Sequence, residues 1–250
     1  MIYQPSHRLS SRIARKLTRF QSVNKMRLAP GKTVVSFSFD DCPKSAIRGG
    51  VRALEAEGWR STIYVACGLL GTENHHGEIL AGEDVRALQD NGHEIGDHTF
   101  SHLDASKSTL PDFEQDVERN QEALSALGVS PSRTFAYPYG VATPDTKAAM
   151  QRRFKGARGI DMTLHCKSVD LNQIGSFPIY ENSSADTIGA IRAIAKSGGW
   201  ITLFTHDIRD NPSEWGCTPK TMQSIIEAIK DVGADILTIE GAIQAFGEAA

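Results

Sequence analysis

From residue 33 onward, short apolar runs alternate with longer stretches whose apolar residues recur every three or four positions. The short runs have the length and the β-branched and aromatic content of strands. The longer stretches are typical of amphipathic helices that bury one face. Eight runs are predicted to be strands: residues 33–39, 61–66, 93–97, 134–138, 156–160, 176–180, 200–206 and 235–239.

The helical stretches carry start and stop signals of their own. In residues 218–233, Thr218 is a typical N-cap, Pro219 suits the first turn, and Gly233 suits the position after the last turn. Residues 112–128 end in the same way, at a glycine. Strands that alternate with helices favour parallel pairing through right-handed crossovers. The pattern therefore predicts one barrel-like α/β domain.

Polar residues gather directly after four of the predicted strands. In α/β barrels the chemistry lies at the C-terminal ends of the strands and in the loops that follow them. The residues at these positions are Asp40 and Asp41, His98 and His102, Tyr139 and Gly140, and His206 and Asp207. Acidic residues, metal-ligand types and a turn thus converge on one rim of the predicted barrel.

Two histidines and a carboxylate form a donor set that suits a divalent transition-metal ion and leaves coordination positions open. His98 and His102 are four residues apart, a spacing that puts both rings on one side of a helical turn. Successive side chains of an extended strand alternate, so one of Asp40 and Asp41 can ligate a metal while the other faces the reacting centre. The residues alone leave open which does which. A solvated pair of aspartates at a strand end is the alternative interpretation.

Four segments, SFDDCP, HTFSH, FAYPYG and LFTHD, resemble in order and spacing the motifs of the polysaccharide deacetylase family (NodB-homology, carbohydrate esterase family 4-like). The resemblance extends over roughly residues 33–240. It implies a distorted (β/α) barrel with seven to eight parallel strands. It also implies a metal-dependent hydrolase that removes N-acetyl groups from the sugars of a glycan or exopolysaccharide precursor and releases acetate. An amidase for a small non-sugar amide or imide is the alternative.

The resemblance also implies individual roles for the rim residues. Asp41, His98 and His102 match the family's metal ligands, which most often hold Zn²⁺. Asp40 matches the catalytic base, which takes a proton from water. A catalytically inactive glycan-binding module is disfavoured because these residues are intact. A non-haem iron oxygenase is disfavoured by the topology and by the paired base and acid.

The remaining matched residues would act on the substrate. His206 matches the catalytic acid, which protonates the leaving amine. The backbone N–H of Tyr139 matches the group that stabilises the oxyanion. Phe204 matches an apolar residue of the acetyl pocket, although a core position would look identical. Trp215 is a candidate for stacking on a sugar ring, with a loop-anchoring role as the alternative.

The sequence departs from the family pattern at two places. Ala136 stands where many members carry an arginine that orients the base. Arg158, in a strand on the same rim, is a candidate replacement that would aim its guanidinium at Asp40, and a strand-edge arginine is the alternative. The family's aspartate that tunes the acid histidine has no clean match. Asp161 and Asp170 are the candidates.

Composition is ordinary for a soluble globular protein, with 40% hydrophobic residues and a net charge of −3. No apolar run approaches the roughly 18 residues that span a bilayer, and no secretory signal is evident. Four cysteines without a CxxC pair argue against a zinc ribbon and favour reduced thiols in the cytoplasm. His75 and His76, in a glycine-rich loop, are interpreted as solvated, with a loop that lines the substrate groove as the alternative.

Basic residues dominate the N-terminus, where eight Lys or Arg and no acidic residue precede Asp40. We therefore divide the chain into a basic amphipathic arm, residues 1–32, and a catalytic domain, residues 33–250. Apolar residues of the arm form one helical stripe: Leu9, Ile13, Leu17 and Phe20. Residues 8–27 are predicted to bind an anionic membrane surface at the cytoplasmic face, where a glycan substrate is lipid-linked. A helix packed on the barrel is the alternative, and no nucleic-acid partner is expected.

Overall fold

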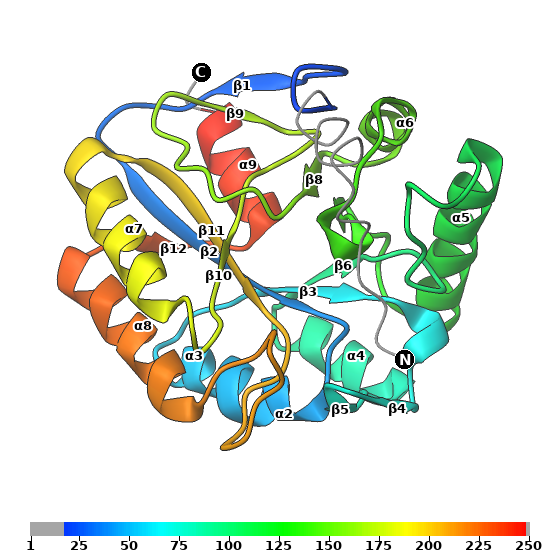
Figure 1. Cartoon of the computed structure of the whole chain (residues 1–250), viewed down its shortest axis with the longest axis horizontal. Coiled ribbons are helices and arrows are strands. Elements are labelled where there is room, and N and C mark those ends of the chain that lie inside the picture. The colour runs from blue at the N-terminus through cyan, green and yellow to red at the C-terminus, as the bar shows by residue number, and fades with distance from the viewer. Residues whose placement is uncertain (1–17, 249–250) are drawn as a thin grey trace.

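An eight-stranded sheet whose neighbouring strands all run parallel forms the middle of the protein (Figure 1). The structure is a computed structural model that describes residues 18–248. Seven strands follow the order β10-β11-β2-β3-β6-β7-β8, and β12 pairs with the first half of β2. The strands are β2 (Thr33–Asp40), β3 (Thr62–Val65), β6 (Glu94–Asp97), β7 (Thr134–Ala136), β8 (Gly156–Arg158), β10 (Phe177–Pro178), β11 (Gly199–Thr205) and β12 (Asp235–Ile236).

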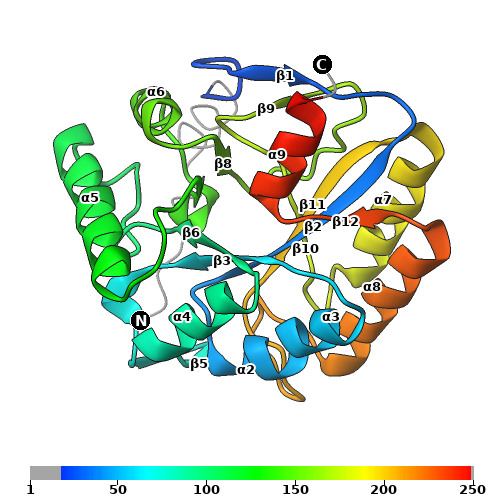
Figure 2. The same ribbon diagram turned by 180° about the vertical axis from the view of Figure 1, so that it is seen from behind.

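The sheet curls into an open barrel, because its path ends at β10 and β8 without closing. All eight runs predicted as strands contribute to it, so the predicted distorted (β/α) barrel is confirmed. Helices surround the sheet, with α7 and α8 together on one side and α9 across the sheet from α3 (Figures 1 and 2). The helices are α2 (Lys44–Ala46), α3 (Arg52–Ala56), α4 (Gly82–Asp90), α5 (Leu110–Ala126), α6 (Pro144–Arg153), α7 (Ser184–Ser197), α8 (Pro219–Val232) and α9 (Ile239–Gly247), with a π-helical turn η1 (Ile47–Val51) between α2 and α3.

Threonine N-caps start four of these helices. The side chains of Thr109, Thr143, Thr218 and Thr238 each accept a hydrogen bond from a backbone N–H of the first turn. Such caps satisfy donors that have no partner within the helix. A proline follows within two residues in α5, α6 and α8, where its fixed φ suits the first turn. The bounds predicted for α8 from its cap and terminal glycine are confirmed to within a residue.

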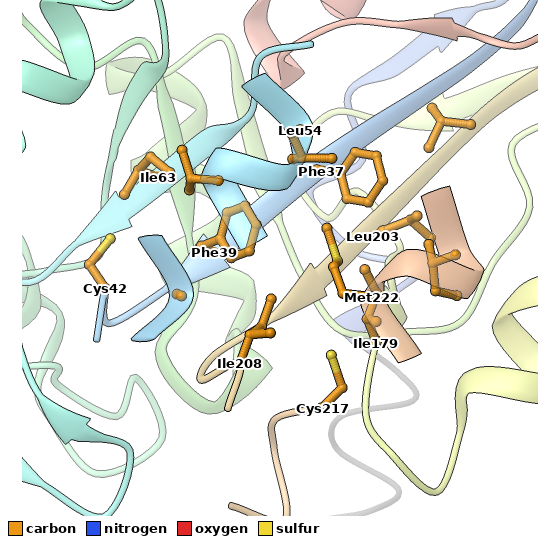
Figure 3. Packing of buried hydrophobic residues seen from close by; sticks show 14 of the residues in the cluster. Phe37, Phe39, Cys42, Leu54, Ile63, Ile179, Leu203, Ile208, Cys217 and Met222 are labelled. Carbon is orange, nitrogen blue, oxygen red and sulfur yellow. The ribbon is translucent and has the colours of Figure 1, made fainter. Parts of the chain in front are cut away.

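Alternation along β2 divides the interior into two faces. Phe37 and Phe39 pack with Leu54 and Leu203 in the core beneath η1, α3 and α8 (Figure 3). The alternate residues Ser36 and Ser38 point to the opposite face. There Trp200 donates from Nε1 to Ser36 Oγ at 2.9 Å. On that face α9 closes a second core, in which Phe246 packs with Trp200. The same alternation turns Asp40, the last residue of β2, into the barrel.

Two short strand pairs lie outside the main sheet, and the sequence predicted neither. Strand β1 (Lys25–Arg27) pairs antiparallel with β9 (Ser168–Asp170), and β4 (Glu73–Asn74) pairs antiparallel with β5 (Gly77–Glu78). Strands of two or three residues are too short to show a hydrophobic period. Two 3₁₀ turns, η2 (Cys67–Leu69) and η3 (Pro138–Gly140), follow β3 and β7.

The predicted amphipathic helix of the arm lies mostly outside the described residues, since Leu9, Ile13 and Leu17 precede residue 18. The described part of the arm packs on the body: β1 pairs with β9, and Thr18 O accepts a hydrogen bond from Lys147 Nζ at 3.1 Å. The division into arm and catalytic domain stays a prediction. Within residues 18–248, no helix combines the length and the apolar character that a membrane span requires.

Candidate active site

Left-handed backbone conformations mark the rim at the C-terminal ends of the strands. Six described residues other than glycine have positive φ, and five of them lie in the loops after β2, β6 and β7: Asp41, Cys42, Thr99, His102 and Tyr139. Such conformations cost free energy in L-residues and cluster at functional sites. They bend the chain where the predicted chemistry gathers.

Asp41 lies against the rings of His98 and His102. The Oδ1 atom of Asp41 is 3.8 Å from Nε2 of His98 and 3.4 Å from Nε2 of His102. One candidate ligand atom from each of the three residues falls within 4.8 Å of the others. The two histidines lie in a loop, so the interpretation of their spacing as a helical turn is wrong. Positive φ values at Thr99 and His102 bring the rings together instead.

The donor set fits a divalent metal ion. Oδ1 of Asp41 is buried and has no hydrogen-bond partner, which leaves a carboxylate oxygen to be satisfied by a cation. His98 donates from Nδ1 to the carbonyl of Ala136 at 2.7 Å, and this contact fixes the tautomer that turns Nε2 toward Asp41. Burial opposes ionisation of Asp41, but the nearby His102 and His98 hold its pKa well below the ordinary value. Asp41, His98 and His102 are therefore suited to ligate a transition-metal ion.

Asp40 meets Arg158 inside the barrel. Nη2 of Arg158 donates to Oδ2 of Asp40 at 2.5 Å, and the guanidinium lies 4.8 Å from the ring centroid of Phe204 and 5.2 Å from that of Tyr64. Burial alone would raise the pKa of Asp40, but the charge of Arg158 lowers it below its ordinary value. Oδ1 of Asp40 has no hydrogen-bond partner. Asp40 is thus an ionised carboxylate with one oxygen available.

The register of the sheet explains how Arg158 reaches this position. Ala136 of β7 pairs directly with Arg158 of β8. The small side chain at 136 leaves room on the inner face, and an arginine on the neighbouring strand reaches Asp40. Its side chain is only 1% exposed, so the strand-edge interpretation does not fit it.

Asp40 and Asp41 both face the rim centre, although they are neighbours in the chain. The alternation argument holds only up to Asp40, because Asp41 leaves the extended conformation with a φ of 57°. Cys42 N–H donates to Asp40 O at 2.6 Å and closes this tight turn. The candidate base and the candidate metal ligand therefore lie side by side.

His206 completes the rim at the end of β11. Its Nδ1 lies 3.2 Å from the backbone carbonyl of Trp215, which leaves Nε2 to face the site. Burial and the charge of His76 lower the pKa of His206 to about 4. Neither candidate aspartate for tuning His206 contacts it: Asp161 binds Arg19, and Asp170 binds Lys147.

His76 is the residue that sequence reasoning missed. It was interpreted as solvated, yet it is 3% exposed and its ring stacks on that of His206 at 4.5 Å. Its Nε2 is 3.8 Å from Oδ2 of Asp41, and its Nδ1 is 3.3 Å from Oδ1 of Asp207. The β4–β5 hairpin places it over the rim. The only signal in the sequence is a histidine pair between two very short extended segments.

The remaining predicted site residues border the same centre. The ring of Tyr139 packs edge-on against His102 at 4.4 Å, and burial raises the pKa of its hydroxyl to about 12. Trp215 is partly exposed and packs edge-on against His75 at 5.0 Å. Phe204 is buried beneath the guanidinium of Arg158. All the predicted site residues are thus gathered at one end of the barrel, while their roles remain predictions.

Comparison with solved structures shows the same fold in enzymes of low sequence identity. The Xyl-CE4 domain of a multidomain xylanase from the hindgut metagenome of Trinervitermes trinervoides is 19% identical, with a TM-score of 0.61 over 87% of this chain and 92% of that chain. A peptidoglycan N-acetylglucosamine deacetylase bound to an N-hydroxybenzamide is 17% identical, with a TM-score of 0.61 over 92% and 96%. A family 4 acetyl xylan esterase from Clostridium thermocellum in complex with a cobalt ion is 18% identical, with a TM-score of 0.58 over 86% and 92%.

Sequence comparison identifies the family. The profile of the polysaccharide deacetylase family matches residues 27–154, which is 128 of the 250 residues and covers β2 through α6. The matched region contains Asp40, Asp41, His98, His102 and Tyr139. The chain therefore belongs to the polysaccharide deacetylase family, whose deacetylases are hydrolytic enzymes.

Proposed function

We propose that this protein is a metal-dependent N-deacetylase that hydrolyses the acetamide of N-acetylated sugars in a glycan and releases acetate. The observation that carries the proposal is the buried Asp40–Arg158 pair beside the donor set of Asp41, His98 and His102. The pair supplies an ionised base with one free oxygen, and the donor set supplies a place for a Lewis acid. Two of the similar structures support the proposal, one named as an N-acetylglucosamine deacetylase and one bound to cobalt.

Asp41, His98 and His102 would hold the ion, with Zn²⁺ as the first candidate because the donors are two imidazoles and a carboxylate. When bound, such an ion lowers the pKa of water and polarises an acetamide carbonyl. The carbonyl of Ala136 orients His98 for this role. The loss of that ion on chelation should abolish activity, and its return should restore it.

The protein's own groups would move the protons. Oδ1 of Asp40 accepts a proton from water, while Arg158 holds the other oxygen and keeps the carboxylate ionised. The backbone N–H of Tyr139 donates to the developing oxyanion. Because its pKa is about 4, the imidazole of His206 is neutral at pH 7. It therefore has to receive the proton that it passes to the leaving amine.

Assays of acetate release from N-acetylglucosamine oligomers, compared with small amides and imides, test the proposal. Mass spectrometry of the products locates the freed amine. We expect the oligomers to be hydrolysed and the small amides to be poor substrates. Preferential hydrolysis of a small non-sugar amide would support the amidase alternative and contradict the proposal. Binding of the oligomers without any turnover would indicate an inactive glycan-binding protein.

We further propose that the protein works at the cytoplasmic face of a membrane on a lipid-linked glycan. Exposed apolar side chains near the rim support this: Phe20 is 82% exposed and Met162 is 58% exposed. The ion pair between Arg19 and Asp161 joins the segment that carries Phe20 to the segment that carries Met162. Ile160, in the second segment, packs against Gly140 of the rim. Apolar residues among cations are typical of interfacial binding.

Co-sedimentation with anionic liposomes tests the membrane proposal. Full-length protein should bind at low salt, and binding should weaken as salt rises. Deletion of residues 1–17, which leaves β1 and the contacts of Thr18 and Asn24 in place, should weaken binding and leave hydrolysis of a soluble oligomer intact. If the truncated protein unfolds, or if the full-length protein does not bind the liposomes at low salt, the arm has a structural role and the membrane proposal is wrong.

A further inference from the structure

The second carboxylate oxygen of Asp41 faces a second pair of histidines. Oδ1 lies toward His98 and His102, whereas Oδ2 is 3.8 Å from Nε2 of His76. Asp41, His76 and His206 offer three ligand atoms within 4.8 Å of one another, the same closeness as in the first set. The two sets share Asp41 alone: Oδ1 contacts the histidines of the first set, and Oδ2 contacts His76 of the second.

The rings of the second pair are oriented as metal ligands usually are. Nδ1 of His76 lies 3.3 Å from Oδ1 of Asp207 and 3.2 Å from Oγ of Ser213. Nδ1 of His206 lies 3.2 Å from the carbonyl of Trp215. Metal-bound histidines commonly donate their other ring N–H to a carboxylate or carbonyl in this way, and the contact fixes which nitrogen faces the ion.

The supporting network around His76 is built and buried. Asp207 is fully buried, and its carboxylate also accepts from Ser213 N–H at 2.8 Å and from Nε of Arg209 at 2.8 Å. The rings of His76 and His206 stack at 4.5 Å with an interplanar angle of 13°, and each has a ring nitrogen within 4.8 Å of a carboxylate oxygen of Asp41. Packing alone does not require a buried carboxylate that fixes the orientation of the His76 ring.

We propose that Asp41, His76 and His206 form a second divalent-cation site, joined to the first by Asp41 as a bridging carboxylate. Two-metal hydrolytic centres hold their ions roughly 3.5–4 Å apart, a separation that one carboxylate spans. Asp207 supports this site through His76. If His206 is the acid of the proposed deacetylation, a second ion occupies the nitrogen that it needs. On that basis, which rests on the proposed function, the second ion inhibits the enzyme.

Counting bound metal tests the site without any substrate. Tag-free full-length protein is stripped with a chelator, dialysed against rising Co²⁺, and analysed for cobalt per chain. Wild-type protein should reach two ions, and His76→Ala should reach one. Asp207→Asn should weaken only the second ion, by roughly 10–100-fold. His75→Ala, a change at the exposed neighbour, is the matched control and should keep both ions.

Two results would overturn the site: a wild-type protein that saturates at one Co²⁺, or a His76→Ala protein that still binds two. The single ion retained by His76→Ala shows that the variant is folded around the first site. His76→Gln, which keeps most of the volume, serves as a second variant, and it too should bind one ion.

Turnover measured against Co²⁺ concentration tests the inhibition separately. Activity should rise with the first ion and fall with the second in wild type and in His75→Ala, and the fall should be absent in His76→Ala. A second ion that binds without lowering turnover would overturn the inhibitory role. Absence of turnover on every acetylated substrate would contradict the proposed function, and the cobalt count would still decide whether the second site exists.

Discussion

Two pairs of a cation and a carboxylate, one partly buried and one fully buried, differ in how fully their polar atoms are hydrogen-bonded. Between α6 and β9, Lys147 Nζ donates to Asp170 Oδ2 at 2.8 Å and to the carbonyl of Thr18. Oδ1 of Asp170 accepts from the backbone N–H groups of Asn24 and Asn172. In the barrel, Asp40 Oδ1 and the Nε of Arg158 are buried without partners.

On the proposed function, the difference separates a pair that holds the fold from a pair that would serve the reaction. Buried polar atoms are nearly always hydrogen-bonded, and one left without a partner costs about 1–3 kcal/mol. The Lys147–Asp170 pair joins α6, β9 and the segment before β1, and it leaves no buried side-chain atom without a partner. The Arg158–Asp40 pair keeps one carboxylate oxygen free beside the candidate metal ligands Asp41, His98 and His102. A carboxylate oxygen that is free to accept a proton is what a general base requires.

Asp40→Asn should have the largest effect on catalysis. The amide still accepts the hydrogen bond of Arg158, but it cannot take a proton from water, so kcat should fall by roughly 10²–10⁴-fold. The melting temperature and the bound metal should change little. The comparison variant is Asp41→Asn, which should lose the metal. If Asp40→Asn lost the metal and Asp41→Asn kept it, the roles of the two aspartates would be exchanged.

Arg158→Ala should lower both turnover and stability. Arg158 is almost fully buried, so its removal leaves the Asp40 carboxylate without a countercharge and opens a cavity between Tyr64 and Phe204. Loss of one partner of a buried pair costs about 3–5 kcal/mol. If Arg158 did not pair with Asp40, the Arg158→Ala variant would be nearly as stable as the wild-type protein. Urea unfolding at pH 7 measures the loss.

A double-mutant cycle then isolates the coupling in the barrel. Arg158→Ala combined with Asp40→Asn should be less destabilised than the sum of the two single changes, because the buried charge is gone. Strict additivity of the two free energies would mean that the pair contributes no coupling. In that case the buried contact would not explain the stability loss.

Lys147→Met should also reduce stability, but by less than the roughly 3–5 kcal/mol of a fully buried pair, because Asp170 loses its cation while its side chain is 18% exposed to water. Methionine preserves much of the apolar length of the side chain. In contrast to the barrel pair, kcat per folded molecule should remain at the wild-type value. Urea unfolding and turnover corrected for the folded fraction measure the two effects. A fall in corrected kcat would remove the distinction between the two pairs.

Sequence reasoning located much of the site because two simple rules of β-structure determine where its residues lie. The two-residue period of β2 turns Asp40 inward, and parallel strands deliver their following loops to one edge. The same logic allowed Arg158 to be chosen, since its strand shares that edge. The direct pairing of Ala136 with Arg158 depends on sheet register, which the sequence constrains only weakly in strands of three residues.

The missed features depend on single backbone conformations. His98 and His102 converge because Thr99 and His102 adopt left-handed conformations in a loop. The residue types threonine and histidine do not predict these positive φ values. His76 reaches the site on a hairpin of two-residue strands, which is too short for any period to reveal. Asp207 was visible beside His206, but its partner was not, because the contact spans 131 residues of sequence.

The smallest expected effect concerns histidines away from the rim, which accept hydrogen bonds instead of presenting a free nitrogen. Ser61 N–H donates to Nδ1 of His93 at 3.2 Å, and Nε2 of His93 lies 3.1 Å from Oε1 of Glu55. Nε2 of His165 lies 3.1 Å from the backbone nitrogen and 3.2 Å from the carbonyl oxygen of Gly175. An acceptor nitrogen carries no proton, so the ring of His93 is neutral in the fold. Burial lowers the pKa of each below its ordinary value.

Stability should therefore fall as the pH drops through about 6.5, where histidines of the unfolded chain take up protons that His93 and His165 in the fold do not. The sign follows because the unfolded state binds more protons in the interval between the lowered pKa values and the ordinary one. His165→Gln and His93→Gln should each flatten the dependence, since an amide does not titrate. Urea unfolding at pH 7.5 and 5.5, with the first metal site kept saturated, measures it. An unchanged pH dependence in the double variant would mean that these two histidines take up protons in the fold as readily as in the unfolded chain, and that burial does not lower their pKa values.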